Sequence, residues 1–168
     1  MAYLSKGGMI LDIFCTYDSP MGPLLLISDG EYLTGLYFSR EAPEKIAEIP
    51  VFLLAKRWLD AYFQGENPQI TVSMALQGTE FQKRVWEILL TIPYGQTRTY
   101  GSIAKQLAAQ MGKEKMSAQA VGQAVGRNPV SILVPCHRVV GEKRKLTGYT
   151  GGMEKKIWLL QHEGWLPK

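Results

Sequence analysis

The residues in this sequence best suited to chemistry are a cysteine and a histidine side by side, in the run Pro135-Cys136-His137-Arg138-Val139. Cysteine is a strong nucleophile, and a neighbouring base or cation raises its thiolate fraction. The run follows an apolar stretch at residues 130–134, which places the thiol at the end of a buried segment. Free cysteines are also common as inert core residues, and neighbouring side chains on an extended segment point to opposite faces. The pair alone therefore leaves both a nucleophile and a core cysteine open.

Composition predicts a soluble, cytoplasmic protein with no membrane partner. The chain has 168 residues, 46% of them hydrophobic, enough for the core of one domain or two small ones. No apolar run approaches the ~20 residues that span a bilayer. The N-terminus lacks the basic region, apolar stretch and cleavage site of a signal peptide. Residues 1–8 precede the first expected strand and are either a leader or an added remnant.

The few cysteines and histidines argue against a metal site or a disulfide framework. The chain has two of each, without metal-ligand spacing, so we expect no bound metal and a reducing compartment. Cys15 lies in a strand-like apolar run and is expected to be buried and inert.

The net charge of +4 suits an anionic partner. A basic cluster at residues 143–145 is either a charged turn or a phosphate contact.

The first half of the chain reads as short strands followed by a helix. Three runs are rich in β-forming residues: 11–17, 24–28 and 33–38. Turn-forming residues separate them, and such short connections predict an antiparallel meander. A helix is expected from Pro50 to about Gln64. Its expected core contacts are Phe52, Leu53, Leu59 and Phe63. Residues 70–75 are either another strand or an extended link.

The second half reads as helices. Thr79, followed three residues later by Gln82, forms a capping-box pattern ahead of an apolar face. Two further helices, at 100–111 and 117–125, are joined by a short Gly-containing connection. They are either a helix-turn-helix or an ordinary helical hairpin packed in a core. The second is slim, with Ala118, Ala120 and Gly122 on its surface, and so allows close approach of another helix or a nucleic-acid backbone. A last helix ends at residues 161–164.

Several short motifs occur in one order along this second half. They are Ile92-Pro93-Tyr94-Gly95 before Thr99-Tyr100, Ala120-Val121-Gly122, Arg127-Asn128-Pro129, Pro135-Cys136-His137-Arg138-Val139, Gly148-Tyr149-Thr150-Gly151-Gly152 and His162-Glu163-Gly164. Together they resemble the O6-alkylguanine-DNA alkyltransferase (methylated-DNA–protein-cysteine methyltransferase) family. The resemblance is strong from about residue 81 to residue 164, and looser before it.

The resemblance implies an α+β fold in two domains. Residues 1–76 would form a ribonuclease H-like scaffold, an antiparallel sheet with a helix. Residues 77–168 would form a mostly helical domain with a winged-helix-like helix-turn-helix, which binds DNA and carries the acceptor thiol.

The resemblance also implies the chemistry. The family moves an alkyl group from O6 of guanine, and also from O4 of thymine, onto its own cysteine in one in-line displacement. Cys136 would be this nucleophile, and each molecule would react once because a thioether is a poor leaving group. His137 would act as a base through a water, and Glu163 would orient the imidazole. No cofactor is required.

Further residues would hold the damaged base. Tyr100 would donate near guanine N3, and Tyr149 would stack on the base; each is otherwise a core aromatic residue. The carbonyls of Cys136 and Val139 would accept from the exocyclic amine, and the backbone around Thr150 and Gly151 would bind O6. Asn128 would support the turn that carries the thiol, although Asn-Pro is also an ordinary turn signal.

The expected partner is double-stranded DNA carrying O6-alkylguanine, bound by a monomer that is nucleoid-associated when on DNA. The slim helix, with Ala118, Ala120 and Gly122, would enter the minor groove and the base would be flipped out. Gln119 aligns with the arginine that fills the gap in this family, but it lacks the fixed charge and planar fork of arginine. Arg127 would contact a phosphate.

Three alternatives compete with this interpretation. An alkyltransferase-like protein that only recognises lesions would lack the acceptor cysteine, which this chain retains. A transcription regulator of the related two-function type would carry a cysteine-rich metal module, which is absent from the sequence. A cysteine hydrolase using Cys136 and His137 would turn over many times and would need an oxyanion-hole motif that the sequence does not show.

Overall fold

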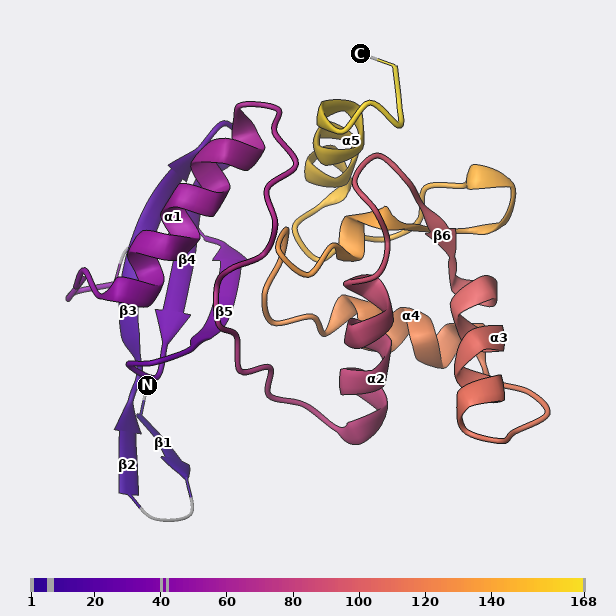
Figure 1. Cartoon of the computed structure of the whole chain (residues 1–168), viewed down its shortest axis with the longest axis horizontal. Helices are drawn as coiled ribbons and strands as arrows, with labels where there is room; N and C mark the ends of the chain where they lie inside the picture. The colour runs from indigo at the N-terminus through magenta and orange to yellow at the C-terminus, as the bar shows by residue number, and fades with distance from the viewer. Residues whose placement is uncertain (1, 6–7, 40, 42, 168) are drawn as a thin grey trace. The chain divides into compact units, whose positions relative to one another are not determined.

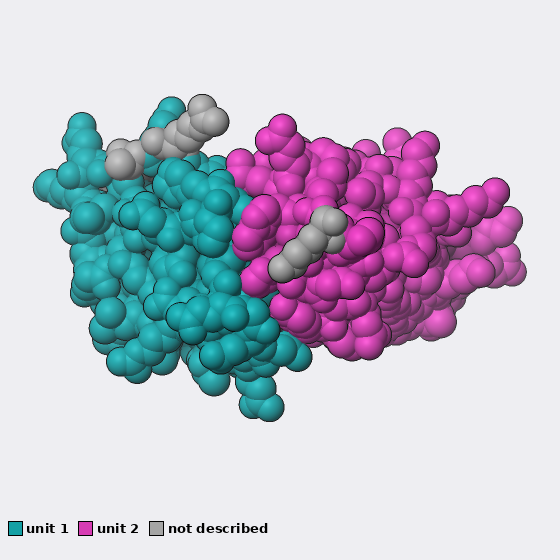
Figure 2. Space-filling model, turned by 90° about the horizontal axis from the view of Figure 1, so that it is seen from above, with its two compact units in different colours: residues 1–76 teal, residues 77–168 magenta. Residues whose placement is uncertain are grey.

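The computed structural model describes residues 2–5, 8–39, 41 and 43–167, and the chain divides into two compact units, Met1–Leu76 and Gln77–Lys168 (Figures 1 and 2). From the sequence, residues 1–8 are either a leader or an added remnant. Of these, Met1, Lys6 and Gly7 lie outside the described residues. Strands β1 (Ala2–Ser5) and β2 (Gly8–Leu11) pair antiparallel.

Unit 1 contains the predicted antiparallel meander. Strands β3 (Ile13–Ser19), β4 (Gly22–Ser28) and β5 (Leu33–Phe38) lie in the order β3-β4-β5. The β3–β4 turn closes at Gly22, whose φ of 103° is a conformation that glycine adopts without a steric penalty. Residues 70–75 form an extended link, with one isolated bridge between Leu33 and Met74.

Helix α1 (Pro50–Phe63) packs on this sheet (Figure 1). Phe52 and Leu59 are fully buried, as predicted, and Phe63 is half-buried. The prediction for Leu53 is wrong, because this side chain is 47% exposed. Positions spaced by three and four residues share a helix face. That spacing brings Tyr62 to the sheet with Phe52 and Leu59, and turns Leu53 outward.

Unit 2 is mostly helical and completes the predicted α+β fold class. Its helices are α2 (Glu80–Leu89), α3 (Tyr100–Gln110), α4 (Ala118–Gly126) and α5 (Met153–His162). The short parallel strands β6 (Arg98–Thr99) and β7 (Val139–Val140) pair beside them. Two 3-10 turns, η1 (Cys136–Arg138) and η2 (Glu142–Arg144), flank β7.

The capping box at the start of α2 is confirmed. The Gln82 amide donates to the Thr79 hydroxyl at 3.1 Å, and the Thr79 amide donates to the Gln82 side chain at 3.0 Å. The apolar face of α2 is buried, and Trp86 donates its indole N–H to the Ala124 carbonyl at 2.9 Å. Helix α4 packs against both α2 and α3. The use of α3 and α4 as a DNA-binding helix-turn-helix stays a prediction.

Among the described residues, no helix is long and apolar enough to cross a membrane.

Candidate active site

A continuous buried segment carries Cys136 into the middle of unit 2. Every residue from 128 to 140 is buried. Asn128 braces this segment: its side-chain amide donates to the Val134 carbonyl at 2.8 Å, and its side-chain oxygen accepts from the Val130 amide at 3.0 Å. Between these contacts Ile132 has a φ of 71°, which a β-branched residue rarely adopts. The two Asn128 hydrogen bonds therefore hold a strained turn just before the thiol.

Cys136 begins the 3-10 turn η1 and lies at a pocket of about 580 Å³. Only 4% of the residue is exposed. Burial raises the pKa of the Cys136 thiol, while hydrogen bonds from Asn128 and Tyr149 and the charge of Lys156 act in the opposite direction. The thiol is therefore mostly protonated at neutral pH, and its reaction as a nucleophile requires a base.

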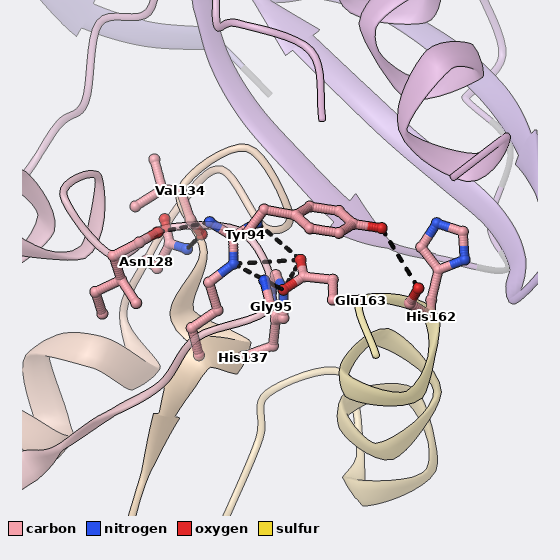
Figure 3. A network of polar contacts seen from close by, with 9 residues as sticks. Tyr94, Gly95, Asn128, Val134, His137, His162 and Glu163 are labelled. Carbon is pink, nitrogen blue, oxygen red and sulfur yellow. Dashed lines mark hydrogen bonds and ion pairs between the residues drawn. The ribbon is translucent and has the colours of Figure 1, made fainter. Parts of the chain in front are cut away.

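His137 follows on the same turn and is fully buried. Its Nε2 lies 2.8 Å from Glu163 Oε1 (Figure 3). An ionised carboxylate can only accept hydrogen bonds, so His137 Nε2 carries the ring proton and His137 Nδ1 keeps its lone pair. Within the described chain, this buried Nδ1 has no hydrogen-bond partner. Burial lowers the pKa of His137 and Glu163 opposes this effect, so the imidazole is neutral and its free nitrogen can accept a proton.

Glu163, the C-terminal cap of α5, is almost fully buried and is the centre of this network. Arg138 donates to both of its carboxylate oxygens, with Nε 2.9 Å from Oε2 and Nη2 2.8 Å from Oε1. The Gly95 amide adds a bond of 3.2 Å. Although burial alone would raise it, the pKa of Glu163 is held well below its usual range by His137 and Arg138. These partners compensate for an acid at the end of a helix, where the dipole disfavours it.

Sequence reasoning missed the role of Arg138. It is buried, and its Nη1 also donates to the Ile92 carbonyl at 2.7 Å. Its position next to His137 was visible, but nothing local indicates that both side chains reach one carboxylate. The signal available was indirect: a buried carboxylate beside a neutral imidazole needs a cation.

Lys156 on α5 was also missed, because the run Glu154-Lys155-Lys156 reads as a solvated helix face. Lys156 is fully buried, and its Nζ donates to the carbonyls of Val139 at 2.6 Å and Thr147 at 2.9 Å. It thereby ties the segment after the thiol to the loop that closes the pocket. Burial lowers the pKa of Lys156 to about 8, although the nearby Cys136 favours its charged form.

We expect the contribution of Lys156 to stability to increase at alkaline pH. Its pKa is about 8 in the folded chain and 10.5 for the free side chain. Between these values the unfolded state binds more protons, so the free energy of unfolding rises with pH. Urea unfolding of the wild type and of Lys156→Met across this range measures the difference. Parallel curves would show that the pKa of Lys156 is not depressed.

The pocket brings together seven of the predicted site residues. They are Tyr100, Ala118, Gln119, Gly122, Cys136, Tyr149 and Thr150. Gly122 faces the Tyr100 ring, where a Cβ would lie 3.7 Å from the ring carbons. Thr150 donates its hydroxyl to the Gly126 carbonyl at 2.9 Å. Val139, three residues after the thiol, is fully buried. Gly151 follows Thr150 in sequence but does not line the pocket.

Two predicted DNA-contact residues lie outside this pocket, Ala120 on α4 and Arg127 as its C-terminal cap. Ala120 and Arg127 line a separate hollow with the first turn of α2, at Thr79 and Phe81. The basic cluster at 143–145 includes Arg144, whose guanidinium stacks 4.3 Å from the Trp165 ring centroid. That packing favours the charged-turn interpretation for Arg144.

Known proteins resemble both units. The DNA-binding domain of 6-O-methylguanine DNA methyltransferase matches residues 80–165, and the ribonuclease-like domain of the same family matches residues 13–76. A methylated-DNA–protein-cysteine methyltransferase of Mycobacterium leprae is 47% identical over 151 residues, covering 87% of this chain and 88% of the relative. One from Methanosarcina acetivorans is 47% identical over 157 residues, covering 90% of this chain and 97% of the relative.

Solved structures of the same family are also similar to this chain. The crystal structure of the O6-methylguanine methyltransferase of Mycobacterium tuberculosis aligns with a TM-score of 0.78 and 45% identity, covering 94% of this chain and 96% of that one. A crystal structure of Mycobacterium tuberculosis OGT in complex with DNA also has a TM-score of 0.78, with 45% identity, covering 92% of this chain and 94% of that one.

Proposed function

Because the chain belongs to the 6-O-methylguanine DNA methyltransferase family, we propose that it repairs DNA by moving an alkyl group from O6 of guanine to Sγ of Cys136. The observation that carries this proposal is the buried thiol at the pocket, followed in sequence by an imidazole that is bound to a carboxylate through Nε2 and whose Nδ1 has no hydrogen-bond partner among the described residues. O4-alkylthymine is a second substrate.

The reaction starts with removal of the thiol proton. His137 Nδ1 accepts this proton through a bridging water, and the imidazolium that forms is stabilised by Glu163 at 2.8 Å. Arg138 holds the carboxylate ionised and oriented, with contacts to both of its oxygens. Because the network is buried, its electrostatic interactions are stronger than they would be in water.

The thiolate then displaces the base. The S–C bond forms as the C–O6 bond breaks, and the electron pair of that bond goes to the guanine. Tyr100 donates a hydrogen bond near N3, which stabilises the guanine anion as it leaves, and the backbone around Thr150 and Gly151 binds O6. The guanine then takes up a proton from solvent, and His137 releases its proton to solvent. The carbonyls of Cys136 and Val139 hold the exocyclic amine, and Tyr149 lies against the base. The Lys156 bond to Val139 supports this step by positioning that carbonyl.

The target atom lies inside a duplex, so the base must leave the stack to reach the pocket. The proposed route is through the minor groove, against α4. Its small residues Ala118 and Gly122 line the pocket, together with Gln119, which lies between them in sequence. Gln119 fills the gap left by the flipped base. Arg127 and Ala120 contact the DNA backbone from the other side of α4.

The charge of the residue at position 119 is expected to set part of the affinity for DNA. Gln119→Arg adds a cation at the groove, so we expect tighter binding and a salt dependence steeper by about 0.9 in log–log slope per added phosphate contact. Gln119→Ala should bind more weakly and repair more slowly. Fluorescence anisotropy with a labelled O6-methylguanine duplex over a salt series measures both effects. If neither substitution changes binding or the repair rate, Gln119 does not fill the gap.

The two units have different proposed roles. Residues 77–168 bind DNA and accept the alkyl group, and residues 1–76 serve as a scaffold; the division of the chain between Leu76 and Gln77 supports this assignment. The protein acts as a monomer in the cytoplasm and is nucleoid-associated when bound to DNA. No cofactor takes part, since the substrate carbon and the protein sulfur suffice.

A stoichiometric assay tests this function. With excess O6-methylguanine DNA, product should rise to one equivalent of protein and then stop, because the thioether is not cleaved. Continued turnover would point to a cysteine hydrolase instead. Binding without any product would point to a protein that only recognises lesions or to a DNA-binding regulator.

A further inference from the structure

A second cluster of ionisable side chains, around a buried cysteine, lies in unit 1 and takes no part in the proposed repair reaction. It consists of Cys15 on β3, Glu48 in the segment before α1, and Lys56 on α1. The Cys15 thiol donates to Glu48 Oε1 at 2.8 Å. The Lys56 ammonium forms an ion pair with the same oxygen. A thiol, a carboxylate and an amine therefore meet at one atom.

The backbone holds these groups in place. The Ala47 amide donates to the Phe14 carbonyl at 2.9 Å, which fixes the residue before Glu48 beside the residue before Cys15. Lys56 reaches the thiol through Glu48, because both groups contact the same oxygen, Oε1. The Cys15 residue is 2% exposed, but the side chains that cover it are open to solvent, at 50% for Glu48 and 26% for Lys56. Movement of these two side chains would open the sulfur to a small oxidant.

We propose that hydrogen peroxide joins Cys15 to Lys56 through a covalent S–N bond, which locks β3 to α1. Sulfenic acids are known to condense with nitrogen nucleophiles to sulfenamides. The chain supplies the amine next to the sulfur and a carboxylate that contacts both groups. The bond closes a long loop between a strand and a helix, which restricts the unfolded chain.

The chemistry balances with one peroxide. The sulfur attacks a peroxide oxygen, the S–O bond forms and the O–O bond breaks, and one water leaves with the thiol proton taken up through Glu48. The sulfur has then given two electrons to the peroxide, and Cys15 is a sulfenic acid. The Lys56 amine, after losing a proton to Glu48, attacks the sulfur. The S–N bond forms, the S–O bond breaks, and the hydroxyl leaves as a second water.

The reaction is expected to be slow compared with that of a surface thiolate. Burial raises the pKa of the Cys15 thiol and Glu48 adds to the effect, while Lys56 opposes it. The thiolate is therefore scarce, and Glu48 must take the proton as oxygen is transferred. A gradual response to sustained oxidant follows from this environment.

The test uses full-length protein carrying Cys136→Ser, which leaves Cys15 as its one thiol. After peroxide treatment and quenching with catalase, the protein is digested without reductant and analysed by mass spectrometry. We expect one joined pair of peptides, containing Cys15 and Lys56, lighter than their sum by two hydrogens. Dithiothreitol should separate them. The oxidised protein should melt a few degrees higher, and dithiothreitol should reverse that shift.

Lys56→Arg in the same background is the matched control, because it keeps a cation beside Glu48 but removes the primary amine. We expect no joined peptides from it, and Cys15 oxidised further to sulfinic acid. The proposal is overturned if the Cys136→Ser protein, which retains Lys56, also gives sulfinic acid without a joined pair of peptides. It is equally overturned if the link retains an oxygen, or if Cys15 stays reduced at a peroxide dose that oxidises Cys136 in the wild type. None of these outcomes bears on repair, which is measured separately at Cys136.

Discussion

Cys136→Ser should transfer no detectable alkyl group while it keeps its fold and its affinity for O6-methylguanine DNA. Serine has nearly the same shape, so the buried segment from Asn128 to Val140 should remain intact. Its hydroxyl is a much weaker nucleophile, and the same His137 cannot ionise it to a useful extent. A gel assay for repaired DNA measures transfer, and anisotropy measures binding.

Cys15→Ser is the matched control, because it removes the other buried thiol of the chain. We expect it to repair DNA at the wild-type rate. Transfer by the Cys136→Ser protein, or its loss in the Cys15→Ser protein, would show that Cys136 is not the acceptor.

Glu163→Gln should have the second largest effect, on both stability and rate. The substitution leaves the Arg138 guanidinium buried without a counter-charge. Breaking a buried ion pair in this way costs about 3–5 kcal/mol. It also removes the group that stabilises the protonated His137, and loss of general-base catalysis lowers rates by about 10²–10⁴-fold. Single-turnover kinetics and urea unfolding measure the two effects. Glu87→Gln, an exposed position on α2, is the control and should change neither.

The same network sets the acid sensitivity of the protein. The pKa of Glu163 is held below its ordinary value of 4.5, so its stabilising contribution is complete above that pH and is lost as pH falls through the folded value. The pKa of His137 is lowered from 6.5, so its contribution is likewise lost on acidification below 6.5. Wild-type stability should therefore fall in two stages, and Glu163→Gln should lack the stage below pH 4.5. Identical acid profiles for the two proteins would contradict this assignment.

Local patterns were enough to predict most elements of the fold. The capping box at Thr79 and the glycine-closed turn at Gly22 depend on residues close in sequence, and both are present in the structure. The error at Leu53 arose within a correctly predicted helix. Apolar residues at neighbouring positions cannot all face one sheet, and only the packing decides which of them turns outward.

The candidate site was less accessible to such reasoning, because its parts are joined by long-range contacts. The resemblance supplied Cys136, His137 and Glu163 as residues of one site, and the structure places His137 against Glu163. It did not supply Arg138 as the counter-charge or Lys156 as the support for Val139. Each of these cations is defined by partners distant in sequence, and neither spacing nor composition records such pairs.

The most direct test of the central claim follows the alkyl carbon itself. The protein is mixed with duplex DNA whose O6-methylguanine carries a ¹³C-labelled methyl group, and the digested protein is analysed by tandem mass spectrometry. We predict that the labelled methyl group is found on the sulfur of Cys136, at one per molecule, with unmodified guanine left in the DNA. Label on another residue, or released to solvent while Cys136 stays unmodified, would contradict direct transfer to this thiol.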